Sequence, residues 1–192
     1  MKPNCQHCSD SRDDPKAPAD QRRRRLVELA VLGGGVSVLA AARAETSKPS
    51  ATEALLLSCM DYRLMDDVAR HMTDIGLTEG YDHIVLAGAS LGAVTHKFPA
   101  WNQTFWEHLQ IALKLHGIKR VILLDHRDCG AYKVLLGPAH TRTRDLERRE
   151  HEKQLTQLAG QIRKKHPTLI VEAKLMDLDG KVEVVALPGA RA

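Results

Sequence analysis

The sequence predicts an α/β fold, with a mostly parallel β-sheet flanked by helices and a β-hairpin at its C-terminal end. Short apolar runs such as residues 54–58 are typical of strands that are covered on both faces. Longer segments with apolar residues at helical spacing alternate with these runs. Near the C-terminus, Asp177-Leu178-Asp179-Gly180 is a turn signal between two further apolar segments, which predicts the hairpin.

The first half of the expected domain alternates strand, helix and strand. Residues 54–58 form an unbroken apolar strand, and residues 65–75 place apolar side chains on one face of a helix. Gly76 ends this helix, and residues 82–87 form the second strand. We expect the small residues 88–92 to form a turn after it, where glycine lets the backbone approach the neighbouring segments closely.

The second half continues the alternation and ends in the two hairpin strands. The remaining expected elements are a helix at 100–116, a strand at 120–125, helices at 129–136 and 145–166, and strands at 169–175 and 181–187. Gly117, Gly137 and Pro167 end the three helices. Basic and acidic residues, Arg148 and Glu147 among them, alternate at the start of the last helix, which we interpret as a solvated face.

Composition indicates one globular domain without a disulfide framework. The 192 residues are 43% hydrophobic, and the four cysteines are too few for a disulfide scaffold. Residues 1–44 hold 8 Lys/Arg and 5 Asp/Glu, which leaves 20 and 19 for residues 45–192. The nearly neutral domain does not support nucleic-acid binding, and we expect no nucleic-acid partner.

The first 44 residues read as a targeting segment rather than as part of the domain. A polar stretch comes first, then Arg22-Arg23-Arg24-Arg25, a short apolar stretch and the cleavage-site-like Ala42-Arg43-Ala44. This resembles a twin-arginine export signal with Arg23-Arg24 as the pair, and it predicts a periplasmic or otherwise extracytoplasmic protein. The alternatives are an uncleaved membrane anchor at residues 26–42, short of the roughly 20 residues that span a bilayer, or an ordinary Ala/Gly-rich helix.

Residues 45–53 are the expected linker, and residues 54–192 are the expected α/β domain. Cys5-Gln6-His7-Cys8, near the N-terminus, is a lone Cys-x-x-Cys that would bind a metal or form a disulfide. It precedes the export signal, so cleavage would remove it from the mature protein.

Two motifs carry the chemistry, and each directly follows an expected strand. Cys59-Met60-Asp61-Tyr62-Arg63 follows residues 54–58, and His126-Arg127-Asp128-Cys129-Gly130 follows residues 120–125. Ligands gather at the carboxyl ends of the strands in open α/β sheets. Two thiolates and an imidazole at this edge suit tetrahedral zinc with a fourth position left open. The alternatives are inert buried thiols or a redox-active cysteine pair.

Asp61 and Arg63 form an Asp-x-Arg pair beside the first cysteine. A guanidinium makes charge-assisted, often bidentate hydrogen bonds with a carboxylate, and it thereby keeps the carboxylate ionised. Such a carboxylate accepts a hydrogen bond from water at a neighbouring metal.

Taken together, the two motifs resemble those of the β-class carbonic anhydrases over roughly residues 55–187. By this resemblance Cys59, His126 and Cys129 match the zinc ligands, and Asp61 and Arg63 match the family's Asp-Arg dyad. The chain departs from the family at two places. Where the family has Arg-Asn-Ala-Gly-Asn, this chain has Leu86-Ala87-Gly88-Ala89-Ser90. Where the family has Gly-His-Ser-x-Cys-Gly-Gly, this chain has Asp125-His126-Arg127-Asp128-Cys129-Gly130-Ala131. The sequence therefore resembles that of a divergent, compact member of the family.

The resemblance implies zinc-dependent hydration of carbon dioxide to bicarbonate by zinc-bound hydroxide, which Asp61 orients and Arg63 holds in place. It also implies a homodimer or a larger oligomer. Relatives that hydrolyse carbonyl sulfide or carbon disulfide make those substrates the first alternative. The second is a non-catalytic, zinc-stabilised subunit of a larger complex, which would contact a membrane if the leader stays uncleaved.

Overall fold

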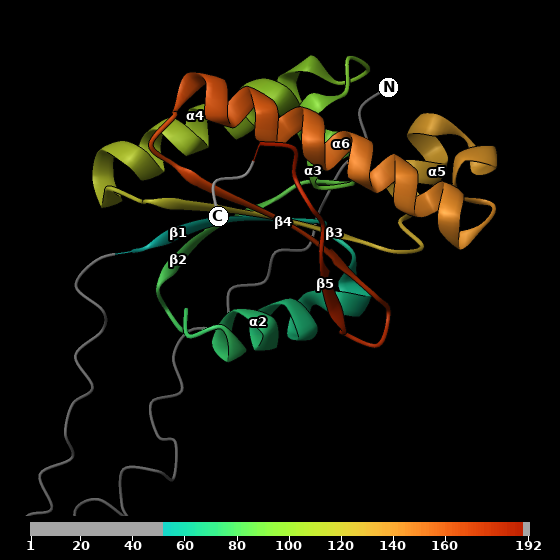
Figure 1. Ribbon diagram of the computed structural model, residues 1–192, viewed down its shortest axis with the longest axis horizontal. Coiled ribbons are helices and arrows are strands. Elements are labelled where there is room, and N and C mark those ends of the chain that lie inside the picture. The colour runs from blue at the N-terminus through green and yellow to red at the C-terminus, as the bar shows by residue number, and fades with distance from the viewer. Residues whose placement is uncertain (1–51, 190–192) are drawn as a thin grey trace, which may run out of the picture. The chain divides into compact units, whose positions relative to one another are not determined.

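Five strands form one sheet in the computed structural model, which describes residues 52–189 (Figure 1). The strands are β1 (Ala54–Ser58), β2 (Tyr81–Val85), β3 (Arg120–His126), β4 (Ile170–Met176) and β5 (Val182–Val184). They lie in the order β2-β1-β3-β4-β5. All neighbouring pairs are parallel except β4 and β5, which are antiparallel. The expected α/β class, the mostly parallel sheet and the C-terminal hairpin are confirmed.

Helices lie on both faces of this sheet. Helix α2 (Met65–Asp74) lies on one face, whereas α3 (Ser90–Val94), α4 (Pro99–His116) and α6 (Arg144–Lys165) lie on the other (Figure 1). The shorter elements are η1 (Tyr62–Leu64), α5 (Gly130–Leu136) and η2 (Pro138–Thr141). Both η1 and α5 begin shortly after a strand ends, so they hold the loops at the carboxyl edge of the sheet.

Side-chain alternation along β1 and β3 divides the interior into two cores. Leu55 and Leu57 pack with Phe105 of α4 and Leu158 of α6, whereas Leu56 packs on the α2 side. All five side chains are at most 1% exposed. Full burial of each contributes about 1.5–3 kcal/mol, and the strands that carry the two motifs are therefore firmly held between the helix layers.

Most element boundaries lie within one residue of the sequence-based expectations, and the larger differences concern three elements. Strand β2 ends at Val85, two residues early, and β5 is shorter than the expected 181–187. The segment expected to be only a turn continues into α3, which begins at Ser90. Tertiary contacts explain this helix, because both the backbone N–H and the hydroxyl of Ser90 donate to the carboxylate of Asp125 on β3.

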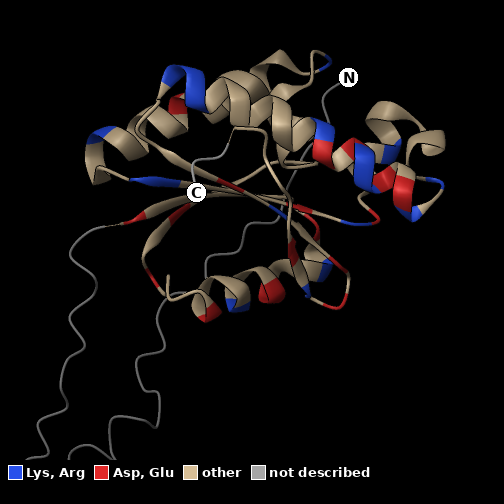
Figure 2. Cartoon of the chain, viewed as in Figure 1, with Lys and Arg blue, Asp and Glu red and all other residues tan. Residues whose placement is uncertain are grey.

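Acidic and basic residues are intermixed along α2 and α6 (Figure 2), as their sequences indicate. Among residues 52–189, no helix has the length and the apolar character needed to cross a membrane. The export signal, the alternative anchor at 26–42 and the Cys5/Cys8 motif lie outside the described residues.

Candidate metal centre

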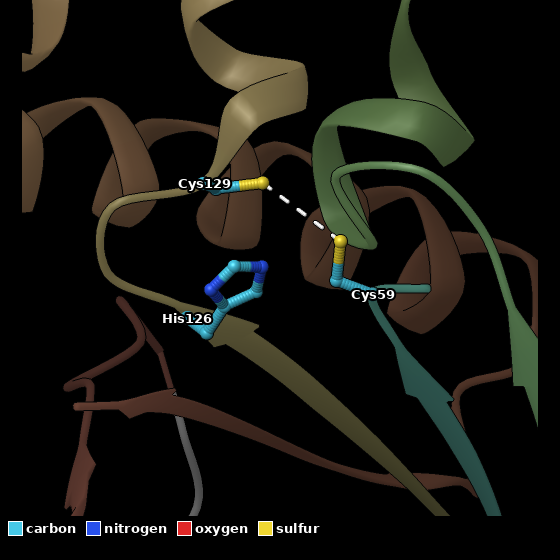
Figure 3. A group of neighbouring side chains, drawn as sticks. All are labelled: Cys59, His126 and Cys129. Carbon is cyan, nitrogen blue, oxygen red and sulfur yellow. Dashed lines mark hydrogen bonds between the residues drawn. The ribbon is translucent and has the colours of Figure 1, made fainter. Parts of the chain in front are cut away.

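The parallel pairing of β1 and β3 brings the two sequence motifs together. Ser58 at the end of β1 pairs with Leu124 of β3, so both strands end at the same edge of the sheet. Cys59 follows β1, His126 is the last residue of β3, and Cys129 is the N-cap of α5. Figure 3 shows the three side chains converging from these elements. Their ligand atoms lie within 4.8 Å of one another, and all three residues are buried.

The donor atoms of this cluster fit a tetrahedral zinc ion. The Sγ atoms of Cys59 and Cys129 are 3.8 Å apart, and two thiolates about 2.3 Å from a tetrahedral zinc have about this separation. His126 Nδ1 lies 2.8 Å from the carbonyl oxygen of Arg127. Because a carbonyl only accepts hydrogen bonds, Nδ1 carries the proton and Nε2 offers its lone pair. This Nε2 is buried and has no hydrogen-bond partner, as expected of a nitrogen suited to metal.

The electrostatics of the cluster favour a thiolate at Cys59. A hydrogen bond with Cys129 is the main cause that lowers the pKa of Cys59 to about 4, and His126 and the backbone N–H of Gly88 add to it. The same hydrogen bond, together with burial, raises the pKa of Cys129. Without a metal the two sulfurs therefore share one proton, which metal binding displaces. Burial lowers the pKa of His126, but the negative charge of the Cys59 thiolate and the hydrogen bond to the Arg127 carbonyl help to raise it overall.

Asp61 and Arg63 form the expected pair beside this cluster. Arg63 Nε donates to Asp61 Oδ1 over 2.9 Å, and Arg63 Nη2 donates to Asp61 Oδ2 over 2.8 Å. These hydrogen bonds are the main reason that the pKa of Asp61 falls to about 2. Asp61 Oδ2 lies 3.8 Å from His126 Nε2. An ionised carboxylate that Arg63 holds in a fixed orientation thus lies beside the cluster.

A family model described as "Putative carbonic anhydrase" matches residues 50–186. The chain belongs to this family. An uncharacterized protein of Rickettsia conorii is 40% identical to the chain over 131 residues, which cover 68% of this chain and 70% of that protein.

Solved carbonic anhydrases are more distant from this family member. One from Glaciozyma antarctica is 18% identical, with 90% of this chain and 98% of that chain covered and a TM-score of 0.49. A structure from Sordaria macrospora, described as one of two tetrameric β-carbonic anhydrases, is 15% identical, with coverage of 72% and 82% and a TM-score of 0.47. Family membership rests on the family model and not on these two structures.

Two carboxylates, those of Asp128 and Glu147, hold the second motif in place, and the sequence alone did not indicate either role. Arg63 Nη1 donates to Asp128 Oδ2 over 2.9 Å, and Lys133 binds the other carboxylate oxygen. The backbone N–H of Asp128 donates to Glu147, which is 7% exposed and lies 3.4 Å from the guanidinium of Arg127. The interpretation of Glu147 as part of a solvated face was therefore wrong.

A buried polar network lies behind the cluster and was also missed. Asp125, at the position of the first glycine in the β-class motif, accepts hydrogen bonds from Ser90, Tyr132 and His151. Each of these side chains is at most 1% exposed. The network joins β3, α3, α5 and α6, and it fixes the segments on which His126 and Cys129 stand. No local spacing in the sequence connects Asp125 with His151, so only the fold shows the pair.

A cavity of about 680 Å³ opens beside the cluster. Its polar part comes from Asp61, Arg63, Asp128 and Lys133. The rest of its lining is mostly apolar, with contributions from Met60, Tyr62, Ala87, Phe98, Trp101, Val134 and Leu135. Phe98 and Trp101 stack with ring centroids 4.3 Å apart and form one wall. A small uncharged molecule therefore has an apolar route to the candidate metal centre.

Proposed function

We propose that this protein binds one zinc ion through Cys59, His126 and Cys129 and hydrates carbon dioxide to bicarbonate. The observation that carries the proposal is the convergence of three buried donors, one of which is a histidine nitrogen that has no hydrogen-bond partner. Two thiolates and one imidazole leave a fourth zinc position for catalysis, as in other sites with three protein ligands. Membership of the putative carbonic anhydrase family supports this reaction over other uses of such a centre.

Zinc, when bound, would act as a Lewis acid and lower the pKa of a water molecule bound to it. In the well-known histidine-ligated carbonic anhydrase this pKa is about 7. The chain itself supplies orientation and a suitable cavity. Asp61 Oδ2 accepts a hydrogen bond from the reacting water, because the paired Arg63 keeps this carboxylate ionised and in place. With a pKa of about 2, Asp61 orients the water without retaining its proton. The apolar walls around Phe98 and Trp101 admit uncharged carbon dioxide.

Stopped-flow measurement of carbon dioxide hydration by the zinc-loaded full chain tests this function. We expect a rate above that of buffer between pH 6.5 and 9, and we expect removal of zinc by a chelator to abolish it. A zinc-loaded protein without hydration activity would contradict the proposal. Carbonyl sulfide and carbon disulfide belong in the same experiment, because the apolar cavity suits these uncharged molecules too. Activity on them alone would identify a hydrolase instead.

We also propose that the protein is a homodimer whose interface includes the rim of the cavity. Met60, Tyr62 and Val134 line the cavity and are 63%, 86% and 80% exposed. Large apolar side chains clustered on a surface are typical of an interface. We expect sedimentation equilibrium to give a dimer or a larger assembly, and we expect Tyr62→Asp to weaken it. A wild-type monomer at micromolar concentration would contradict this proposal.

Export through the folded-protein pathway remains our proposal for the leader, on the strength of Arg23-Arg24 and the apolar stretch that follows. Replacing both arginines with lysine keeps the charge but removes the twin-arginine signal, so the protein should stay in the cytoplasm. Fractionation of cells that express each form measures this. Replacing Arg12 and Arg142, which lie outside the proposed signal, with lysine is a matched control that should leave export unchanged. Equal export of the twin-lysine form would contradict the proposal, whereas a mature protein that begins at Met1 would favour the anchor.

A further inference from the structure

Arg63 is bound between two carboxylates that come from the two motifs. On one side it makes its two hydrogen bonds with Asp61. On the other side Nη1 donates to Asp128 Oδ2 over 2.9 Å, and Nη2 lies 3.2 Å from the carbonyl oxygen of Asp128. Asp128 lies between His126 and Cys129 in the chain. The guanidinium therefore links the loop after β1 to the loop after β3, directly beside the candidate metal centre.

Asp61 is itself a potential ligand of the metal. Its Oδ2 lies 3.8 Å from His126 Nε2. Nitrogen and oxygen donors on one tetrahedral zinc ion lie about 3.3 Å apart, given bond lengths of about 2.0–2.1 Å. A small movement of the Asp61 carboxylate would bring it to the fourth position, where it would exclude water and small anions. Arg63, which binds both oxygens of the Asp61 carboxylate, restrains this movement.

Asp128 is well placed to fix Arg63. Its φ angle of 55° lies in the left-handed region, which Asp and Asn tolerate better than most residues. Its backbone N–H is bound by the buried Glu147, and its second carboxylate oxygen is bound by Lys133. With the backbone and one oxygen held, the other oxygen presents a fixed acceptor to Arg63.

We propose that Asp128 is a positioning residue that holds Arg63, and through it Asp61, away from the metal, so that the fourth position stays accessible. The inference rests on the metal site of the proposed function and not on the hydration reaction. Asp128 is the residue to test because its side chain is 46% exposed, so its replacement leaves the core intact. Asn also tolerates the left-handed backbone, so Asp128→Asn changes the charge and little else.

The test is binding of azide to the cobalt-substituted full chain, followed by visible absorption of the metal. Asp128→Asn should bind the same amount of cobalt as the wild type but should bind azide about 5- to 20-fold more weakly, because the released Asp61 competes for the metal. In an Asp61→Asn background this competitor is absent, so adding Asp128→Asn should leave azide affinity unchanged. This is a double-mutant cycle, and it isolates the coupling between the two residues.

Asp179→Asn is the matched control, since it removes an exposed carboxylate from an ion pair with Lys181 in the hairpin turn. Azide affinity should not change in that variant. Asp128→Gly, which also tolerates the backbone, should reproduce the effect of Asp128→Asn if the latter folds poorly.

Equal azide affinity in Asp128→Asn and the wild type would overturn the inference. An equal loss in the Asp61→Asn background would also overturn it, because Asp128 would then act without Asp61. If the predicted coupling appears but the zinc form does not hydrate carbon dioxide, the proposed reaction fails and the inference stands. Failure of the chain to bind cobalt at this site would overturn both.

Discussion

Cys129→Ser should lose at least nine-tenths of the bound zinc and unfold at a clearly lower temperature than the wild type. Cys129 is 1% exposed, and its sulfur lies 3.8 Å from that of Cys59. These two are the only cysteines among residues 52–189, so no other thiol there can replace Cys129. Metal affinity is also folding free energy, because the unfolded chain offers no preformed site. A ligand at a thousand times its dissociation constant stabilises a fold by about 4 kcal/mol, and the variant would lose most of this contribution.

Elemental analysis and thermal unfolding measure these two effects on the same sample. The wild type stripped of metal by a chelator is the control, because Ser replaces Cys with little change in size. The stripped wild type and the variant should then unfold at nearly the same temperature. A variant that retains one equivalent of zinc would show that Cys129 is not a ligand. A variant far less stable than the stripped protein would point to packing instead.

Asp61→Asn should keep its zinc while hydration of carbon dioxide falls by about two orders of magnitude. The substitution keeps the size of the side chain and removes the charge that pairs with Arg63. A group that orients or stabilises the reacting centre is typically worth 10²–10³ in rate, or about 3–4 kcal/mol. Arg63→Ala should act in the same direction, because it releases the Asp61 carboxylate from both of its side-chain hydrogen bonds.

Hydration rate and zinc content, measured together, separate positioning from loss of metal. Asp67→Asn is a matched control, since it removes the same charge from an exposed pair with Arg70 on α2 and should leave the rate unchanged. If the hydration rate falls only in proportion to the zinc content, Asp61 helps to retain the metal and does not act in the reaction. An unchanged rate at full zinc content would remove Asp61 from the mechanism.

The convergence of Cys59, His126 and Cys129 could be predicted because it follows from two local facts. Each motif directly follows an apolar strand, and the carboxyl ends of parallel strands meet at one edge of the sheet. The Asp61–Arg63 pair was equally predictable, since it lies within one motif. The roles of the three ligands and of this pair in catalysis are predictions that the experiments above test.

The contacts that support the site could not be predicted, because they join distant segments. Alternating charges at the start of α6 look the same whether Glu147 faces water or the buried guanidinium of Arg127. Asp125 and His151 are 26 residues apart, and no periodicity links them. The helix that begins at Ser90 arises for the same reason, since the carboxylate that binds its first turn belongs to β3. Such contacts are consequences of the fold and carry no local sequence signal.

X-ray absorption at the zinc edge of the purified full-length protein tests the central claim most directly. The signal reports the elements bound to the metal and their distances. The account predicts one zinc per chain with two sulfur ligands at about 2.3 Å and two nitrogen or oxygen ligands at about 2.0–2.1 Å. A shell without sulfur would place the metal elsewhere. A shell of four sulfurs would bring in Cys5 and Cys8, exclude His126 and contradict the proposed centre.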